Sequence, residues 1–195
     1  MAVRDDARRL ATRYFEEPAA RFLNSLKLTP NVVTLLGLMG TAGAAYLAGV
    51  GSLLLAGIAL AVASILDMLD GALARLMGSA SRFGAALDSV ADRLSEAVLL
   101  LGVFIFYLRG DDDLGATLAV IALITSYMVS YIRARGEGLG IEMKESGLGT
   151  RPERLVVMIV GLVTGFVMVA LGVVIMLSAA TSGQRMYHLW REVKG

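Results

Sequence analysis

Four aspartates carry the strongest chemical signal in this sequence: Asp67, Asp70, Asp88 and Asp92. The members of the first pair are three residues apart and those of the second pair are four apart, so each pair shares one face of its helix. Carboxylates crowded together cannot all stay ionised without compensation, and hard divalent cations with oxygen ligands supply it. The pattern therefore predicts a site for two Mg²⁺ or Mn²⁺ ions, which would balance the four negative charges.

An alternative interpretation is that these acids form ion pairs with nearby arginines, namely Arg75, Arg82 and Arg93. For one isolated aspartate that interpretation would be the simpler one. Four acids in a chain this apolar favour a functional site, because acidic residues within membrane segments usually mark function.

The composition indicates the class of protein that must position these acids. Of the 195 residues, 56% are hydrophobic and 18% are charged, against about 25% charged in a typical soluble domain. Four stretches contain no charged residue: 28–66, 97–108, 114–132 and 155–184. A helix needs about 20 apolar residues to span a bilayer. We therefore predict an all-α integral membrane protein surrounded by membrane lipids. No basic patch with interleaved aromatic residues suggests nucleic acid, and the lack of cysteine excludes disulfides.

Six transmembrane helices are predicted, and the first uncharged stretch is long enough to hold two of them. The predicted ranges are 31–49, 53–76, 84–108, 114–135 and two helices between 152 and 191, with the last turn near Gly165 or Gly172. Residues 1–27 are expected to form an amphipathic interfacial helix, broken or restarted near Pro18. We interpret 1–195 as one membrane domain, in which 28–195 form the six-helix bundle.

The basic residues predict the orientation of this bundle. With six spans, every lysine and arginine except Arg109 falls on the side that holds both termini. By the positive-inside rule that side is the cytoplasm, so the aspartates should face the cytoplasm from a multi-pass position in the plasma membrane.

Small residues accompany the aspartates in the sequence. Gly71, Ala74 and Gly84 would let a flat or bulky ligand approach the backbone, although close helix packing explains small residues equally well. In the first predicted helix the packing explanation is preferred for all three glycines: Gly37, Gly40 and Gly43.

The segment from Asp67 to Asp92 resembles the complete signature of the CDP-alcohol phosphotransferases, D-x-x-D-G-x-x-A-R, eight residues, G-x-x-x-D-x-x-x-D. The resemblance implies a membrane enzyme that moves a phosphatidyl group from a CDP-linked lipid to an alcohol and releases CMP. It implies that the four aspartates hold two metals and that Asp92 is also the general base. It assigns the cytidine nucleotide to four residues: Gly71, Ala74, Arg75 and Gly84. We expect direct attack without a covalent intermediate, and His188 in the tail is expected to have a surface role.

A second group of basic residues bears on the acceptor alcohol: Arg133, Arg135, Arg151 and Arg154. A phosphorylated acceptor would need guanidinium groups, which bind phosphate in a bidentate way. The alternative is that these arginines anchor the protein to anionic lipid headgroups.

The motifs SYIRAR, RPERL, LTPNVVT, LDMLDG and QRMYHLW further resemble the actinobacterial phosphatidylinositol phosphate synthases. That resemblance implies CDP-diacylglycerol as donor, inositol 1-phosphate as acceptor and phosphatidylinositol phosphate as product. Arg133, Arg135 and Arg154 would then bind the acceptor phosphate, with Arg151 joining them or only bracing the loop. Asn31 and Thr34 would face the diphosphate, although Asn31 is equally suited to cap a helix.

Three other functions compete with this interpretation. Glycerol 3-phosphate as acceptor would make the chain a phosphatidylglycerol phosphate synthase. A cation transporter would place its acids near mid-membrane in repeated halves, which the sequence does not suggest. A non-catalytic assembly protein would tolerate Asp92→Asn. Small-residue helix faces and the family precedent also predict a homodimer.

Overall fold

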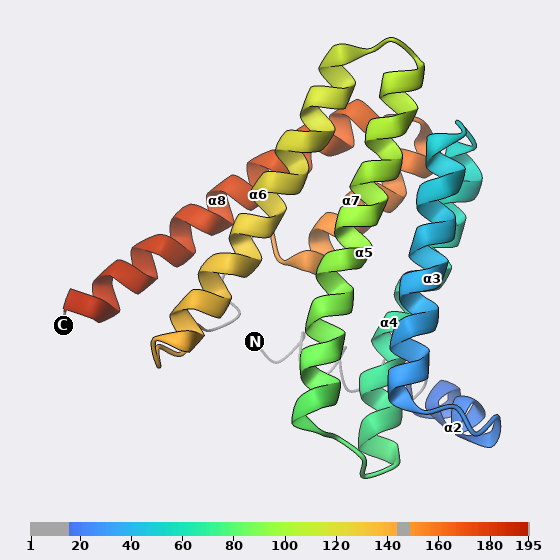
Figure 1. The fold of residues 1–195 in the computed structure, drawn as a ribbon, viewed down its shortest axis with the longest axis vertical. Coiled ribbons are helices and arrows are strands. Elements are labelled where there is room, and N and C mark those ends of the chain that lie inside the picture. The colour runs from blue at the N-terminus through green and yellow to red at the C-terminus, as the bar shows by residue number, and fades with distance from the viewer. Residues whose placement is uncertain (1–15, 144–148, 195) are drawn as a thin grey trace, which may run out of the picture. The chain divides into compact units, whose positions relative to one another are not determined.

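The structure is a computed structural model that describes residues 16–143 and 149–194. All regular structure in these residues is helical, which confirms the all-α part of the predicted fold class (Figure 1). The seven helices of the described residues are α2 (Glu17–Ser25), α3 (Pro30–Gly49), α4 (Leu53–Leu76), α5 (Arg82–Arg109), α6 (Asp113–Gly138), α7 (Arg151–Thr164) and α8 (Val167–Lys194).

Four of these helices, α3, α4, α6 and α8, are long and apolar enough to cross a membrane. Helix α5 is long, but its first half carries the charged residues of the aspartate segment. Helix α7 has 14 residues, or about 21 Å at 1.5 Å per residue, against a hydrocarbon core of about 30 Å. The chain is therefore a helical membrane protein, and the count of six spans stays a prediction.

The helix boundaries follow local signals in the sequence. Helix α3 begins at Pro30, and the turn after it places Gly51 at φ 85°, a left-handed conformation that favours glycine. Helix α4 has the predicted bounds 53–76. Gly165 lies at φ 79° and ends α7, which confirms one of the two predicted turn positions, whereas Gly172 lies within α8.

Side-chain caps fix the starts of α5 and α6. The Ser81 hydroxyl accepts a hydrogen bond from the Gly84 backbone N–H at 3.0 Å. The Asp112 carboxylate accepts one from the Gly115 N–H at 2.9 Å. Each side chain satisfies a backbone N–H that has no partner within the helix. This explains why α5 begins directly after the α4 turn and why α6 begins within the RGDDD segment.

Helix α2 is the described part of the predicted N-terminal amphipathic helix. Pro18 lies in its first turn, as expected for a restart at that residue. Leu23 is buried, whereas Phe22 and Leu26 are exposed. Residues 1–15 lie outside the described part of the chain, so the interfacial position of this segment stays a prediction.

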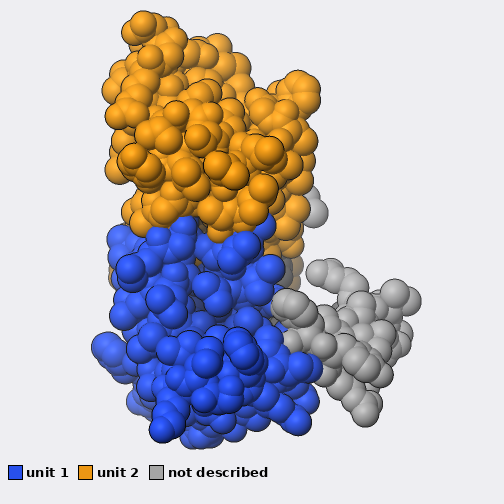
Figure 2. Space-filling model, turned by 90° about the vertical axis from the view of Figure 1, so that its right-hand side faces the viewer, with its two compact units in different colours: residues 1–41, 61–95 blue, residues 42–60, 96–195 orange. Residues whose placement is uncertain are grey.

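Backbone contacts group the chain into two compact units, which Figure 2 colours separately. Unit 1 comprises residues 1–41 and 61–95, and unit 2 comprises residues 42–60 and 96–195. We describe each unit by itself. The prediction of a single domain is not tested by this grouping.

Unit 1 is held together by α2, α3 and α4. Its buried apolar side chains are Ala20, Leu23, Val33, Leu69, Ala72 and Leu73. A Cβ atom added at Gly40 would lie 3.0 Å from the Ala63 Cβ, so this glycine permits close approach of α3 and α4, as predicted. At Gly43 no atom of the described residues lies within 4 Å of such a Cβ, so its packing role stays a prediction.

In unit 2, α8 packs along both α6 and α7. The core includes Leu99, Leu162 and Leu171, which are almost fully buried. Polar contacts cross between α6 and α8: the Ser126 and Ser178 hydroxyls lie 3.4 Å apart, and Arg185 Nη1 donates to the Val129 carbonyl at 2.8 Å. These contacts pair buried polar atoms with one another within the protein, which lowers the cost of burying them.

Candidate active site

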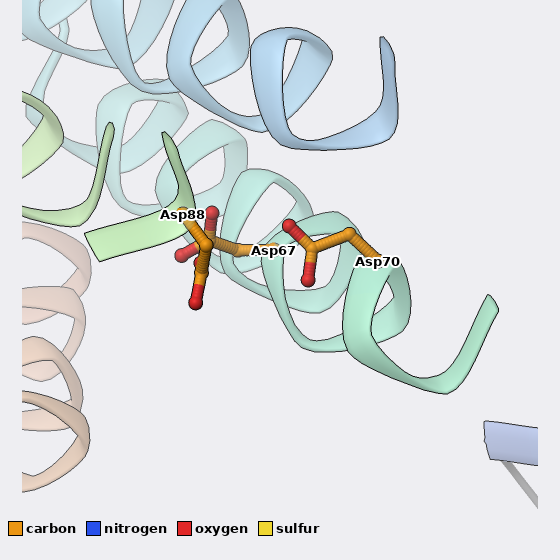
Figure 3. A group of neighbouring side chains, drawn as sticks. All are labelled: Asp67, Asp70 and Asp88. Carbon is orange, nitrogen blue, oxygen red and sulfur yellow. The ribbon is translucent and has the colours of Figure 1, made fainter. Parts of the chain in front are cut away.

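Three of the four predicted aspartates lie together. Asp67 and Asp70 project from α4 and Asp88 from α5, toward one another (Figure 3). One carboxylate oxygen from each side chain lies within 4.8 Å of the other two. Asp70 is buried and the other two are half-buried. Three oxygen ligands at this spacing fit a hard divalent cation, because such ions prefer carboxylate oxygens and would offset the mutual repulsion of the acids.

Asp92 lies one helical turn beyond Asp88 on α5 and is half-buried, but it does not belong to this group of three. Three of the four acids therefore converge as predicted. The roles of Asp92 as metal ligand and general base stay predictions.

Helix α3 supports the two acids of α4. The Thr34 hydroxyl donates to Asp70 Oδ2 at 2.5 Å, and this contact is buried. A Cβ atom at Gly37 would lie 3.2 Å from Asp67 Oδ1, so the absence of a side chain there leaves room for the carboxylate. Helix α3 thus brings a hydrogen-bond donor, from Thr34 of the LTPNVVT motif, and a gap, at Gly37, to the acidic cluster.

A cavity of about 440 Å³ opens beside the cluster within unit 1. Asp70 and Asp88 line it, together with all six residues predicted to face the nucleotide or its diphosphate: Asn31, Thr34, Gly71, Ala74, Arg75 and Gly84. A Cβ atom at Gly84 would lie 3.5 Å from Asn31 Oδ1 and 3.1 Å from Ser81 Oγ. Because glycine has no side chain, only backbone atoms form the cavity wall at this position.

Arg75 also has a partner that the sequence analysis did not identify. Its Nη2 lies 3.2 Å from Glu16 Oε2, and 65% of the Arg75 side chain is exposed. Glu16 precedes α2, and its distance from Arg75 in the sequence gave no signal for this pairing.

The predicted acceptor-binding arginines lie in unit 2, where their surroundings differ. Arg133 Nε pairs with Glu137 Oε1 at 2.8 Å on the surface of α6, and Arg135 is exposed one turn before the end of that helix. Arg151 is the first residue of α7 and is half-buried. Arg154 is 2% exposed. Phosphate binding by this group stays a prediction.

Arg154 is the most constrained of the four. Its Nε and Nη2 donate to the two carboxylate oxygens of Glu96, each at 2.8 Å, and its Nη1 donates to the Gly149 carbonyl at 2.7 Å. The sequence analysis did not identify Glu96. One feature of the sequence could have pointed to Glu96: it lies four residues after Asp92 on α5, as Asp92 lies four residues after Asp88.

His188 has the surface position that was expected for it. Its Nε2 lies 3.4 Å from the Glu142 carbonyl, at an exposed contact in the last helix. No role in the acidic cluster follows from this position.

Comparison with known proteins agrees with the signature. Residues 27–185 match the family model described as CDP-alcohol phosphatidyltransferase. An archaetidylinositol phosphate synthase of Pyrococcus horikoshii is 40% identical over 171 residues, which cover 88% of each chain. The crystal structure of Mycobacterium tuberculosis phosphatidylinositol phosphate synthase with CDP-DAG bound has a TM-score of 0.83 and 32% identity, and the match covers 91% of this chain and 94% of that one.

The same mycobacterial enzyme in complex with manganese and citrate has a TM-score of 0.80 and 31% identity, covering 90% of this chain and 89% of that one. The family match spans most of the sequence and includes the acidic cluster and the cavity beside it. The chain belongs to the CDP-alcohol phosphatidyltransferase family.

Proposed function

We propose that the protein transfers the phosphatidyl group of CDP-diacylglycerol to inositol 1-phosphate, giving phosphatidylinositol phosphate and CMP. The observation that carries this proposal is the convergence of Asp67, Asp70 and Asp88 at the wall of a cavity that the signature residues line. The relatives named for inositol phosphate lipids support the acceptor, and the CDP-DAG-bound structure supports the donor.

Two divalent ions, Mg²⁺ or Mn²⁺, are proposed to bind between the aspartates, with Asp92 completing the ligand set. When bound, they neutralise the diphosphate and stabilise the leaving CMP. Gly71, Ala74 and Gly84 present backbone and little side chain to the cavity, which suits a nucleotide lying flat against its wall. Arg75, Asn31 and Thr34 are proposed to supply donors to the nucleotide and its diphosphate.

The transfer is proposed to occur in one displacement. The acceptor hydroxyl oxygen attacks the lipid-side phosphorus, and the bond from that phosphorus to the bridging diphosphate oxygen breaks. The hydroxyl proton passes to the Asp92 carboxylate, and CMP leaves with the bridging oxygen. A positioned carboxylate base of this kind contributes about 10²-fold to 10⁴-fold to the rate.

The acceptor phosphate is proposed to bind to the arginines of unit 2. Arg135 is exposed, and Arg133 has one surface ion pair that an incoming phosphate can replace at little cost. Arg151 and Arg154 lie three residues apart at the start of α7, so their side chains leave from one face of that helix.

We further propose that the chain forms one membrane domain with six spans, α3 to α8, and that the aspartates face the cytoplasm. The distribution of basic residues supports this orientation. Two copies are proposed to associate as a homodimer, on the precedent of the family.

The test is an acceptor panel with detergent-purified protein, CDP-diacylglycerol and Mg²⁺ or Mn²⁺, with CMP release as the readout. Inositol 1-phosphate should support release, whereas free inositol, serine and choline should not, because they lack the phosphate that the arginines would bind. Release that requires glycerol 3-phosphate and ignores inositol phosphate would instead make the protein a phosphatidylglycerol phosphate synthase.

The donor lipid needs a second arm in the same experiment. The Pyrococcus relative is named for an archaetidyl product, and it matches this chain over most of its length. The archaetidyl counterpart of CDP-diacylglycerol should therefore be assayed beside it. A preference for that donor would change the lipid in the proposal and leave the acceptor unchanged.

A further inference from the structure

Glu96 has no role in the proposed chemistry, yet it forms a buried ion pair with Arg154, one of the proposed acceptor-binding arginines. Glu96 is 7% exposed and Arg154 is 2% exposed. Both carboxylate oxygens are engaged by the guanidinium, at 2.8 Å each. Two parallel bonds of this kind fix the orientation of a guanidinium as well as its position.

The pair is continuous with the segment that leads into α7. Arg154 Nη1 donates to the Gly149 carbonyl at 2.7 Å, and the Gly149 N–H donates to Thr181 Oγ1 of α8 at 2.9 Å. A Cβ atom at Gly149 would lie 2.7 Å from the Leu177 carbonyl oxygen, so the segment rests directly on α8. The contacts of Arg154 and Gly149 thus link three parts of unit 2: helix α5, the segment before α7, and helix α8.

Arg151 stands three residues before Arg154, so both side chains leave from one face of α7. A guanidinium has five N–H donors, so the terminal nitrogens of Arg154 keep N–H groups beyond those in the contacts above. A carboxylate that holds the guanidinium in one orientation also sets where those remaining N–H groups point.

From these contacts we propose that Glu96 is a positioning residue for acceptor binding: it holds Arg154 and thereby orients the start of α7, including Arg151, toward the acceptor phosphate. Arg154 then binds the phosphate, as proposed above, in the orientation that Glu96 sets. The inference rests on the proposed function, since it concerns the acceptor site of the same reaction.

The decisive variant is Glu96→Gln, which keeps the shape of the side chain and removes its charge. We expect the KM for inositol 1-phosphate to rise about tenfold or more, as loss of a supporting hydrogen-bond partner does at other sites, while the KM for CDP-diacylglycerol stays within about twofold. The opposite model, in which Glu96 competes with phosphate for Arg154, predicts a lower KM for the acceptor. The sign of the change separates the two.

Arg154→Gln should give the same pattern, and the double variant should be no worse than the more affected single variant, because the two residues act as one unit. Glu192→Gln is the control: Glu192 is an exposed acid near the end of α8, and its loss should leave both KM values unchanged. A large acceptor effect for Arg154→Gln without one for Glu96→Gln would overturn the inference, because Arg154 would then bind the phosphate without help from Glu96.

Breaking a buried pair can also unfold the protein, so thermal unfolding in detergent is measured for every variant. Glu96→Asp keeps the charge and shortens the side chain by one methylene, and it carries the test if Glu96→Gln does not fold. It should raise the acceptor KM by a smaller factor, and an unchanged KM would overturn the inference. If the wild-type protein releases no CMP with any phosphorylated alcohol, the proposed function fails, and this inference fails with it.

Discussion

At the scale of single residues, the acids of the cluster differ in their surroundings. Asp70 is buried and receives the Thr34 hydroxyl, whereas Asp67 and Asp88 are half-buried. A carboxylate that accepts a fixed hydrogen bond has fewer orientations to lose when it binds a cation. The Thr34–Asp70 contact is therefore expected to set the affinity of the cluster for its metal.

Thr34→Val tests this expectation, because it keeps the branched shape and removes only the hydroxyl. The concentration of Mg²⁺ or Mn²⁺ needed for half-maximal CMP release should rise by about tenfold or more. Thr125→Val is the control: within the described part of the chain, the Thr125 hydroxyl contacts the Ile121 and Ala122 carbonyls of its own helix, at 2.9 and 3.1 Å. An unchanged metal requirement in Thr34→Val would show that the contact does not support metal binding.

Asp92→Asn tests the proposed base at the same scale. The amide cannot accept the acceptor proton, so kcat should fall by about 10²-fold or more, with both KM values little changed. Steady-state kinetics at saturating metal measure this, and Asp113→Asn, at an exposed position on α6, serves as the reference. Full activity of Asp92→Asn would remove this residue from the proton transfer and favour a non-catalytic role for the chain.

Residue spacing explains what the sequence could predict here. Asp67, Asp70 and Asp88 lie on two consecutive helices joined by a short turn, so periodicity within each helix and that turn were enough to predict their convergence. The same reasoning included Asp92, which does not belong to the group. Glu96 and Arg154 are 58 residues apart in the sequence. Their pairing depends on how α5 and α7 pack, which periodicity within one helix does not encode.

At the scale of helices, glycine decides which pairs approach most closely. A Cβ atom at Gly102 of α5 would lie 2.3 Å from the Ala45 carbonyl oxygen of α3. The obstructing atom belongs to the backbone, so the helices would have to move apart to admit a methyl group.

Gly102→Ala should therefore destabilise the protein by about 1–3 kcal/mol, as overpacking generally does. Gly43→Ala provides the control on α3, because no atom lies within 4 Å of the added Cβ. Thermal unfolding in detergent compares the two variants, and equal midpoints would contradict the close contact.

Several helix limits were predictable from the sequence. The predicted limits at 49 and 53, and at 108 and 114, agree with the structure to within one residue, and Gly51 and the capping residue Asp112 lie in these two turns. The last turn was narrowed only to Gly165 or Gly172, and the structure places it at Gly165. The short length of α7 was less accessible, because the uncharged stretch continues past Gly165 without a charged residue. Composition alone therefore gave the total apolar length of this region. It did not show that the region divides into α7 with 14 residues and α8 with 28 residues.

At the scale of the whole molecule, the orientation in the membrane is the prediction with the widest consequences. The chain has no cysteine, so single-cysteine variants can be labelled without background. Ser79→Cys, between α4 and α5, should react with a membrane-impermeant maleimide only from the cytoplasmic side. Asp113→Cys, beside Arg109, should react only from the opposite side. Labelling of both from one side would contradict the proposed topology.

Composition and charge distribution were sufficient to predict a helical membrane protein, because long uncharged stretches have few other structural outcomes. They could not establish two compact units, since α3, α4 and α5 each contribute residues to both. No shift in composition marks that division along the sequence.

Among the described residues, all those that line the cavity beside the acidic cluster fall between Thr29 and Asp88. One continuous piece of the gene therefore encodes this described cavity wall. Recombination between relatives could replace that piece as a block, and later substitutions in the remainder of the chain could diversify the recipient alcohol without disturbing how the activated lipid is held.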